Sequence, residues 1–196
     1  DESGALAVFQ EMASRPTTIV ALNIAIAYGL LFGHKCSTVD AIKAYIQSEL
    51  KSIHPTYIQI PKYLLPPEWR KMDCPVVQLK KALYGHPEAG GHWERHLEAI
   101  IKGMGGKAIP GHPSCFWFAA PLKLFLIVYV DDLLLSGPAE NHEKFWRLLT
   151  DKKVGNIRVE DPEPLDRFLG RKHVTLQGES AAALCLRPLG RGRAPQ

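Results

Sequence analysis

The chain has 196 residues, of which 46% are hydrophobic, and this is enough for one globular domain with a core of ordinary size. Its net charge of +4 does not by itself indicate a nucleic-acid-binding surface, because Arg187, Arg191 and Arg193 account for three of these charges and leave only +1 on residues 1–186. The four cysteines are widely spaced and include no CxxC pair, which favours reduced thiols over a disulfide framework.

The N-terminal part of the chain predicts a helix, a strand and a short helical turn. Thr17 and Thr18 are suitable caps for a helix that runs to about residue 31, and Gly33 ends it. The apolar stretch 19–33 has 15 residues and falls short of the ~20 needed to cross a bilayer. We therefore expect a core helix and no membrane partner. The next two predicted elements are a strand at 36–42 and a helical turn at 43–50.

The middle of the chain predicts a looped excursion followed by a long helix. Five prolines between residues 54 and 78 indicate the excursion, with brief strands at 57–60 and 76–79. From residue 90 to 104 the apolar residues recur at intervals of three and four, which predicts an amphipathic helix. His92 and His96 lie one turn apart on it, as zinc ligands can, but no third ligand is evident. We interpret both as solvated or capping side chains.

The C-terminal half predicts mainly strands. They are expected at 115–118, 124–130 and 133–135, followed by a helix at 139–150 and a last strand pair within 168–176. Residues 177–196 are rich in Gly, Ala, Arg and Pro and are expected to be a disordered basic tail. With a leader at 1–14, this leaves one domain at 15–176. Its predicted fold class is α+β, with an antiparallel sheet backed by helices.

Asp131 and Asp132 interrupt the apolar run of residues 124–137. Charges in buried strands are costly unless they are paired or bind a metal, so this pair is a candidate site. The two halves of the run are each short enough for a strand, which predicts a hairpin whose tight turn carries both carboxylates. Because Asp is also a common turn residue, turn chemistry alone is the alternative interpretation.

A third carboxylate is needed if the acid pair is to hold two Mg²⁺ ions beside a substrate phosphate. The best candidate is Asp40, at the point where a predicted strand passes into a helical turn. Its alternative interpretation is a helix N-cap.

Four segments match, in the same order, the motifs of one known family. Residues 39–46, Val-Asp-Ala-Ile-Lys-Ala-Tyr-Ile, align without a gap with the pattern M-D-V-K-T-A-F-L. Residues 79–93 align without a gap with L-K-x-x-L-Y-G-L-K-Q-x-P-R-x-W, residues 129–132 complete the hairpin motif Y-V-D-D, and residues 167–174 resemble Y-F-L-G-I-E-V. With these motifs the chain resembles the reverse transcriptases of copia-type LTR retrotransposons, from about Arg15 to Val174.

The resemblance implies a polymerase palm with part of the fingers, acting as an RNA-directed DNA polymerase. In such an enzyme Asp40, Asp131 and Asp132 would be catalytic and would hold two Mg²⁺ ions, with Mn²⁺ as a substitute. The ions would activate a primer 3′-hydroxyl for nucleotidyl transfer and steady the departing pyrophosphate. The implied partners are an RNA or DNA template-primer, deoxynucleoside triphosphates and the rest of a polyprotein with integrase and ribonuclease H, all inside the cell. Since the chain begins with Asp1 rather than Met, we expect a segment of a longer protein.

The resemblance also implies the residues that would contact substrates. Tyr45 matches the aromatic residue beneath the incoming sugar, although a buried aromatic on an amphipathic helix is the alternative interpretation. Tyr129 and Glu88 are the other candidate nucleotide-binding residues. Lys80 and Lys81 are candidate contacts to the phosphate backbone of the template-primer.

The sequence departs from the family pattern in one region. Glu88 stands where the family has a Gln near the incoming nucleotide, and Gly90 and Gly91 replace Pro and Arg. A carboxylate at this point would repel a triphosphate. A non-catalytic remnant that keeps the fold and weak nucleic-acid binding is therefore the alternative function. A metal-dependent nuclease is a second alternative, which no His general base or further acid cluster supports.

Overall fold

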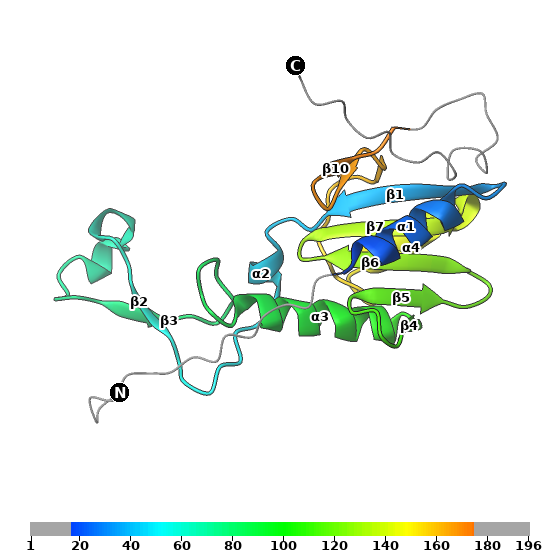
Figure 1. Cartoon of the computed structure of the whole chain (residues 1–196). Helices are drawn as coiled ribbons and strands as arrows, with labels where there is room; N and C mark the ends of the chain where they lie inside the picture. Colours follow the sequence, from blue (N-terminus) through cyan, green and yellow to red (C-terminus); the bar gives the residue numbers. More distant parts are fainter. Residues whose placement is uncertain (1–16, 175–196) are drawn as a thin grey trace, which may run out of the picture.

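The computed structural model describes residues 17–174, whose main sheet is antiparallel and has helices on both faces (Figure 1). The six strands lie in the order β4-β5-β6-β7-β1-β8, and every neighbouring pair is antiparallel. Their bounds are β1 His34–Asp40, β4 Gly106–Ala108, β5 Cys115–Phe118, β6 Leu124–Tyr129, β7 Asp132–Pro138 and β8 Glu163–Pro164. The predicted α+β class, with an antiparallel sheet and helices packed on it, is confirmed.

Side chains of the central strands point alternately to the two faces of the sheet, and each face has its own hydrophobic core. Successive residues of a strand point to opposite faces. Leu124, Leu126 and Val128 pack with α3 (Ala89–Gly103) and α4 (Ala139–Thr150) on one face. Phe125 and Ile127 pack with α1 (Ile19–Gly29) on the other face. Because both faces are covered, β6 is apolar at every position.

The helices begin and end close to their predicted limits. The Thr18 hydroxyl caps α1 by accepting a hydrogen bond of 3.2 Å from the Ala21 amide. In α3 the buried residues Trp93, Leu97 and Ile101 recur every four positions and turn one face of the helix to the sheet. A positive φ of 93° at Gly105, which suits glycine, lets the chain leave α3 for β4. Among residues 17–174 no helix is long and apolar enough to cross a membrane.

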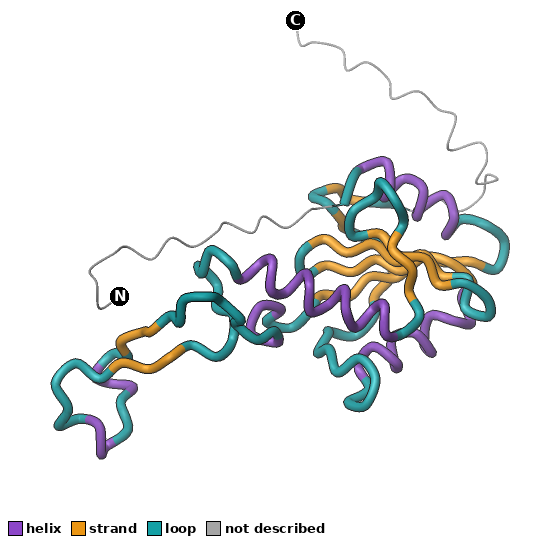
Figure 2. The backbone as a smooth tube through the Cα atoms, turned by 90° about the horizontal axis from the view of Figure 1, so that it is seen from below, coloured by secondary structure: helices purple, strands orange, loops and turns teal. Residues whose placement is uncertain are grey.

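An arm between α2 (Ala44–Gln47) and α3 projects away from the sheet (Figures 1 and 2). Its two short strands, β2 (Tyr57–Gln59) and β3 (Val76–Gln78), pair with each other, as the sequence predicts. Two 3₁₀ turns follow β2, at Lys62–Leu64 and Pro67–Trp69.

The structure differs from the sequence predictions at several short elements. Strand β7 continues three residues past its predicted end at 135, because the Ser136 hydroxyl donates to the Ala25 carbonyl (2.6 Å) and is satisfied inside the sheet. The short strands β4 and β8 are additional to the predicted elements. The last strand pair is reduced to β9 (Arg167–Phe168) and β10 (Arg171–Lys172), which pair with each other. The predicted leader, residues 1–14, and the predicted tail, 177–196, lie outside the described residues.

Candidate functional site

The pairing of β1 with β7 brings carboxylates from distant parts of the sequence together. Asp40, the last residue of β1, lies directly opposite Asp132, the first residue of β7. Directly opposed residues of an antiparallel pair project from the same face, with Cβ atoms about 4.5–5.5 Å apart. Asp131 lies in the two-residue turn before β7, and its carbonyl accepts a hydrogen bond of 2.8 Å from the Ala41 amide. The turn and the end of β1 are therefore joined.

Burial and the negative charges of the three carboxylates raise the pKa values of Asp132 and Asp40. The pKa of Asp132 is raised to about 6, first by burial and then by the charges of Asp131 and Asp40. The pKa of Asp40 is also raised, by burial and then by Asp131 and Glu160. No lysine or arginine within residues 17–174 forms an ion pair with any of the three aspartates. Like charges opposed in this way are destabilising, so the cluster favours a cation from outside the chain.

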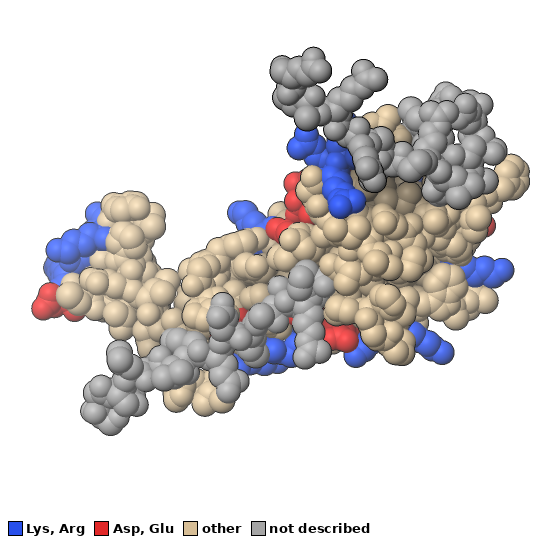
Figure 3. Space-filling view, in the orientation of Figure 1, with Lys and Arg blue, Asp and Glu red and all other residues tan. Residues whose placement is uncertain are grey.

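The donor set suits Mg²⁺, which prefers carboxylate oxygens and keeps several water ligands. The described part of the chain holds no group of three or more His, Cys, Asp or Glu side chains that could enclose an ion as they stand. The aspartate side chains would have to turn toward a shared ion. Figure 3 shows acidic side chains near the end of β1, below the Lys and Arg side chains over β9 and β10.

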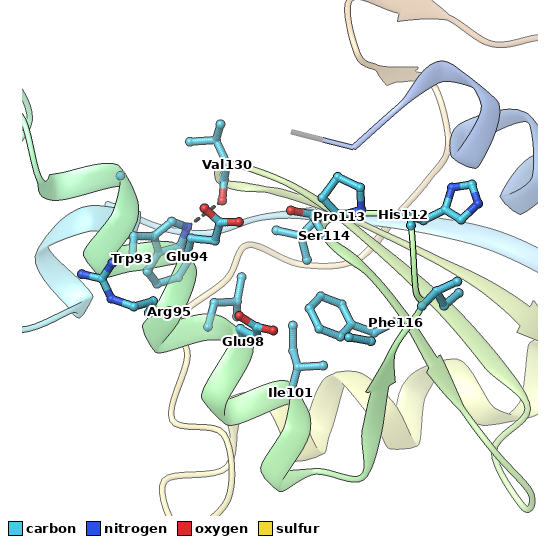
Figure 4. A pocket seen from close by; sticks show the side chains of 16 residues that line it. Trp93, Glu94, Arg95, Glu98, Ile101, His112, Pro113, Ser114, Phe116 and Val130 are labelled. Atoms are coloured by element: carbon cyan, nitrogen blue, oxygen red, sulfur yellow. Dashed lines mark hydrogen bonds between the residues drawn. The ribbon is translucent and has the colours of Figure 1, made fainter. Parts of the chain in front are cut away.

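The turn that carries Asp131 is strained and clamped. Val130 has a positive φ of 57°, a conformation that is unfavourable for a β-branched residue. The indole Nε1 of Trp93 donates a 2.6 Å hydrogen bond to the Val130 carbonyl (Figure 4). Helix α3 thereby holds the turn from the face opposite α1. From the sequence, Trp93 is predicted only to lie on the amphipathic helix and at the last position of the motif at 79–93, with no role at the turn.

A cavity of about 700 Å³ lies behind the turn, between α3 and the loop 109–114 (Figure 4). Its floor is apolar and includes Leu97, Ile101 and Phe116. Glu98 also lines the cavity and pairs with Lys102 at 2.8 Å. The cavity belongs to the face covered by α3, whereas Asp40 and Asp132 share the other face with Leu134 and α1.

Two aromatic rings lie beside the carboxylates. Tyr45, on α2, contacts Tyr84 with the ring centroids 4.4 Å apart. The pKa of Tyr84 is raised by burial and then by the charges of Asp131, Tyr45 and Asp40, so its hydroxyl lies within the field of the cluster. Tyr129 is paired with Asp132 and packs against the core beneath α1. Tyr84 is not among the predicted nucleotide-binding residues, although the motif L-Y-G contains it.

Glu88 is buried, and its carboxylate is engaged inside the protein. It accepts a hydrogen bond from the Ser52 hydroxyl, which lowers the pKa of Glu88, and Oε2 lies 3.5 Å from His92 Nε2. Arg95 lies 3.1 Å from His92 Nδ1. Because guanidinium can only donate, Nδ1 accepts and Nε2 carries the proton that faces Glu88. The interpretation of His92 as a solvated or capping side chain is wrong, since it is only 7% exposed.

The two candidate backbone contacts lie at the end of the arm nearest the sheet. Lys80 and Lys81 are both exposed. Lys80 Nζ donates to Gln78 Oε1 (2.6 Å), and Lys81 Nζ lies 3.4 Å from the Gln47 carbonyl at the end of α2. Their assignment to a template-primer stays a prediction, as do the nucleotide contacts assigned to Tyr45, Glu88 and Tyr129.

Comparison with known proteins agrees with the sequence motifs at a coarse level. No family model matches the chain. It is 25% identical over 164 residues to the transposon Ty1-BR Gag-Pol polyprotein of Saccharomyces cerevisiae, a match that covers 81% of this chain and 9% of the polyprotein. The truncated transposon Ty1-A Gag-Pol polyprotein of the same yeast is 25% identical over 166 residues, covering 81% of the chain and 13% of that protein.

The chain is similar to part of a retrotransposon Gag-Pol polyprotein. The similarity supports an origin in such a polyprotein. The chain spans only about a tenth of the length of these Gag-Pol relatives.

Proposed function

We propose that this chain is the palm, with part of the fingers, of an RNA-directed DNA polymerase from a copia-type retrotransposon polyprotein. The observation that carries the proposal is the register of β1 and β7, which sets Asp40 opposite Asp132 with Asp131 in the adjoining turn. A metal-dependent nucleotidyltransferase needs carboxylates that converge from different segments on one face. The relatedness to Gag-Pol polyproteins supports the same assignment.

Asp40, Asp131 and Asp132 would hold two Mg²⁺ or Mn²⁺ ions. The bound ions would supply activation of the primer 3′-hydroxyl and neutralise charge on the departing pyrophosphate. The primer oxygen attacks the α-phosphate of a deoxynucleoside triphosphate, one phosphodiester bond forms, and pyrophosphate leaves. The ring of Tyr45, which contacts that of Tyr84, would pack beneath the sugar of that nucleotide. Lys80 and Lys81 would contact the phosphate backbone of the template-primer.

The test is extension of a DNA primer on an RNA template by the 196-residue chain in Mg²⁺. We expect weak extension by the wild type, because only part of the fingers is present, loss of extension in Asp132→Asn, and unchanged extension in Asp73→Asn, which removes an exposed carboxylate of the arm. Template-primer binding without any extension would contradict the proposal and favour a non-catalytic remnant. Extension that survives Asp132→Asn would also contradict it.

A further inference from the structure

The backbone around Asp40 is held from two sides where β1 ends. On one side the Ala41 amide donates to the Asp131 carbonyl at 2.8 Å. On the other side residues 158–160 run antiparallel to the chain after β1, and the Glu160 amide donates to the Asp40 carbonyl at 2.9 Å. The position of Asp40 relative to Asp131 therefore depends on both contacts.

The carboxamide of Gln47 closes the second of these contacts. Gln47 is the last residue of α2, and its Oε1 accepts from the Arg158 amide at 2.8 Å. Its Nε2 donates to the Arg158 carbonyl at 2.9 Å and to the Ile42 carbonyl at 2.8 Å. One side-chain amide thus exchanges both hydrogen bonds with Arg158, as the backbone of a neighbouring antiparallel strand would. A flipped amide would satisfy none of the three contacts, so its orientation is defined.

The end of α2 is itself fixed at the root of the arm. The carbonyl of Ser48, a fully buried residue, accepts from the Ala82 amide at 3.2 Å, and the Leu50 amide donates to the Lys80 carbonyl at 3.0 Å. Gln47 therefore lies between two fixed pieces of backbone, the root of the arm and the segment that pairs with the end of β1. A side chain that is held in this way can keep a metal ligand in place.

We propose that Gln47 is a positioning residue that sets the Asp40 carboxylate to bind a divalent metal ion together with Asp131 and Asp132. This inference rests on the proposed function, because that function assigns the metal ions to the three carboxylates. Mg²⁺ demands near-ideal octahedral geometry. A shift at the end of β1 therefore costs affinity even when every carboxylate is still present. Gln47 acts through the backbone and not as a ligand.

The experiment measures the Mn²⁺ affinity of the full chain from the loss of the electron paramagnetic resonance signal of the free ion. Gln47→Met keeps the length of the side chain and removes its three hydrogen bonds. It should weaken Mn²⁺ binding by about fivefold, within the range of coupling carried by residues that do not touch the ligand. Gln59→Met, which replaces an exposed glutamine of β2 in the arm, is the matched control and should bind as the wild type does.

A double-mutant cycle shows whether Gln47 acts through Asp40. In the Asp40→Asn background, Gln47→Met should change the Mn²⁺ affinity by less than about twofold, because the ligand that it positions is already altered. A merely structural role for Gln47 would instead weaken binding equally in both backgrounds, and that result overturns the inference.

The remaining outcomes separate this inference from the proposed function. If Mn²⁺ binding depends on Asp132 but is unchanged in a folded Gln47→Met variant, the positioning role is wrong and the metal site stands. A wild type that does not bind Mn²⁺ contradicts both. Should far-UV circular dichroism show Gln47→Met unfolded, Gln47→Glu takes its place, since it keeps the acceptor for the Arg158 amide and removes both donors. It should show the same loss of about fivefold despite its added negative charge, and unchanged or tighter binding overturns the inference.

Discussion

At the scale of single residues, Asp132 carries a charge that the fold alone disfavours. Its pKa is raised to about 6 by burial and by its two carboxylate neighbours, whereas an unfolded Asp titrates near about 3.9. The folded state therefore holds the proton more tightly. Its free energy of unfolding falls as the pH rises from about 4 to about 6 and stays lowered above that range. A bound cation would reverse this effect.

Asp132→Asn removes that unfavourable charge. In EDTA at pH 7 we expect the variant to be more stable than wild type by up to about 1 kcal/mol, a value reduced for the partial exposure of the side chain. The gain should vanish near pH 4, and added Mg²⁺ should stabilise only the wild type. Thermal melts from pH 4 to pH 7 check this. A marked loss of stability at pH 7 would instead make Asp132 a structural hydrogen-bonding residue.

Trp93 contributes to the site through its contact with the strained turn. Trp93→Phe removes the 2.6 Å hydrogen bond to the Val130 carbonyl while keeping an aromatic ring in the core. Because a partly buried carbonyl is left without its donor, we expect a loss of about 1 kcal/mol in urea unfolding. Trp69→Phe in the arm is the control and should change stability by less than about 0.5 kcal/mol. Equal effects of the two substitutions would show that the clamp on the turn is unimportant.

At the scale of elements, the arm is anchored to α3 by buried polar groups. The Ser52 hydroxyl, at the base of the arm, donates to Glu88, and Glu88 faces the protonated Nε2 of His92. The pKa of Glu88 is lowered by these contacts, so their stabilisation is present above the unfolded pKa and is lost as the pH falls through the lower folded pKa. A repulsive role for Glu88 toward a triphosphate needs its side chain to leave this position.

Glu88→Ala should loosen the arm. We expect faster hydrogen exchange in residues 50–82 and a loss of about 1–3 kcal/mol at pH 7, because the Ser52 hydroxyl loses its acceptor and the buried His92 loses the carboxylate that faces it. The difference from wild type should shrink below about pH 4. The control is Glu49→Ala, which breaks only the exposed pair with Lys51 and should leave exchange unchanged. Unchanged exchange in Glu88→Ala would show that the arm is held by other contacts.

The spacing of apolar residues along the chain predicts the long helices well and the shortest strands poorly. The predicted bounds of α4, residues 139–150, match the structure, and α3 is displaced by one residue. Both helices have one strongly apolar face, which is a local property of the sequence. Strand β8 has two residues, and its existence depends on pairing with Ser37 and Thr38, more than a hundred positions away. No local pattern encodes such a contact.

The same distinction applies to the candidate site. The hairpin follows from the apolar runs on either side, although its turn carries only Asp131 and not both carboxylates as predicted, because Asp132 begins β7 opposite Asp40. Asp40 enters through the order of motifs. The residues that contact this hairpin and its neighbours cannot be predicted from a local sequence pattern. The clamp from Trp93, the ring contact between Tyr84 and Tyr45, and the inward position of Glu88 all depend on how α3 and the arm pack in three dimensions.

At the scale of the whole molecule, the two covered faces of the sheet explain how charged residues persist beside an apolar core. The strands β1 and β7 are held along seven opposed pairs, from His34–Pro138 to Asp40–Asp132. The carboxylates lie at the last of these pairs, where the sheet ends and solvent can enter. Strand pairing thus fixes the backbone positions of three carboxylates whose negative charges repel one another. The proposed polymerase function requires that this cluster binds divalent metal ions.

Binding of Mn²⁺, followed by the loss of the electron paramagnetic resonance signal of the free ion, tests that claim most directly. We predict that the wild type binds Mn²⁺ and that Asp40→Asn and Asp132→Asn each weaken the affinity by more than about tenfold, since each removes a charged ligand. Asp73→Asn, in the arm, should bind as the wild type does. Equal binding by all four proteins, or no binding by the wild type at millimolar Mn²⁺, would contradict the account.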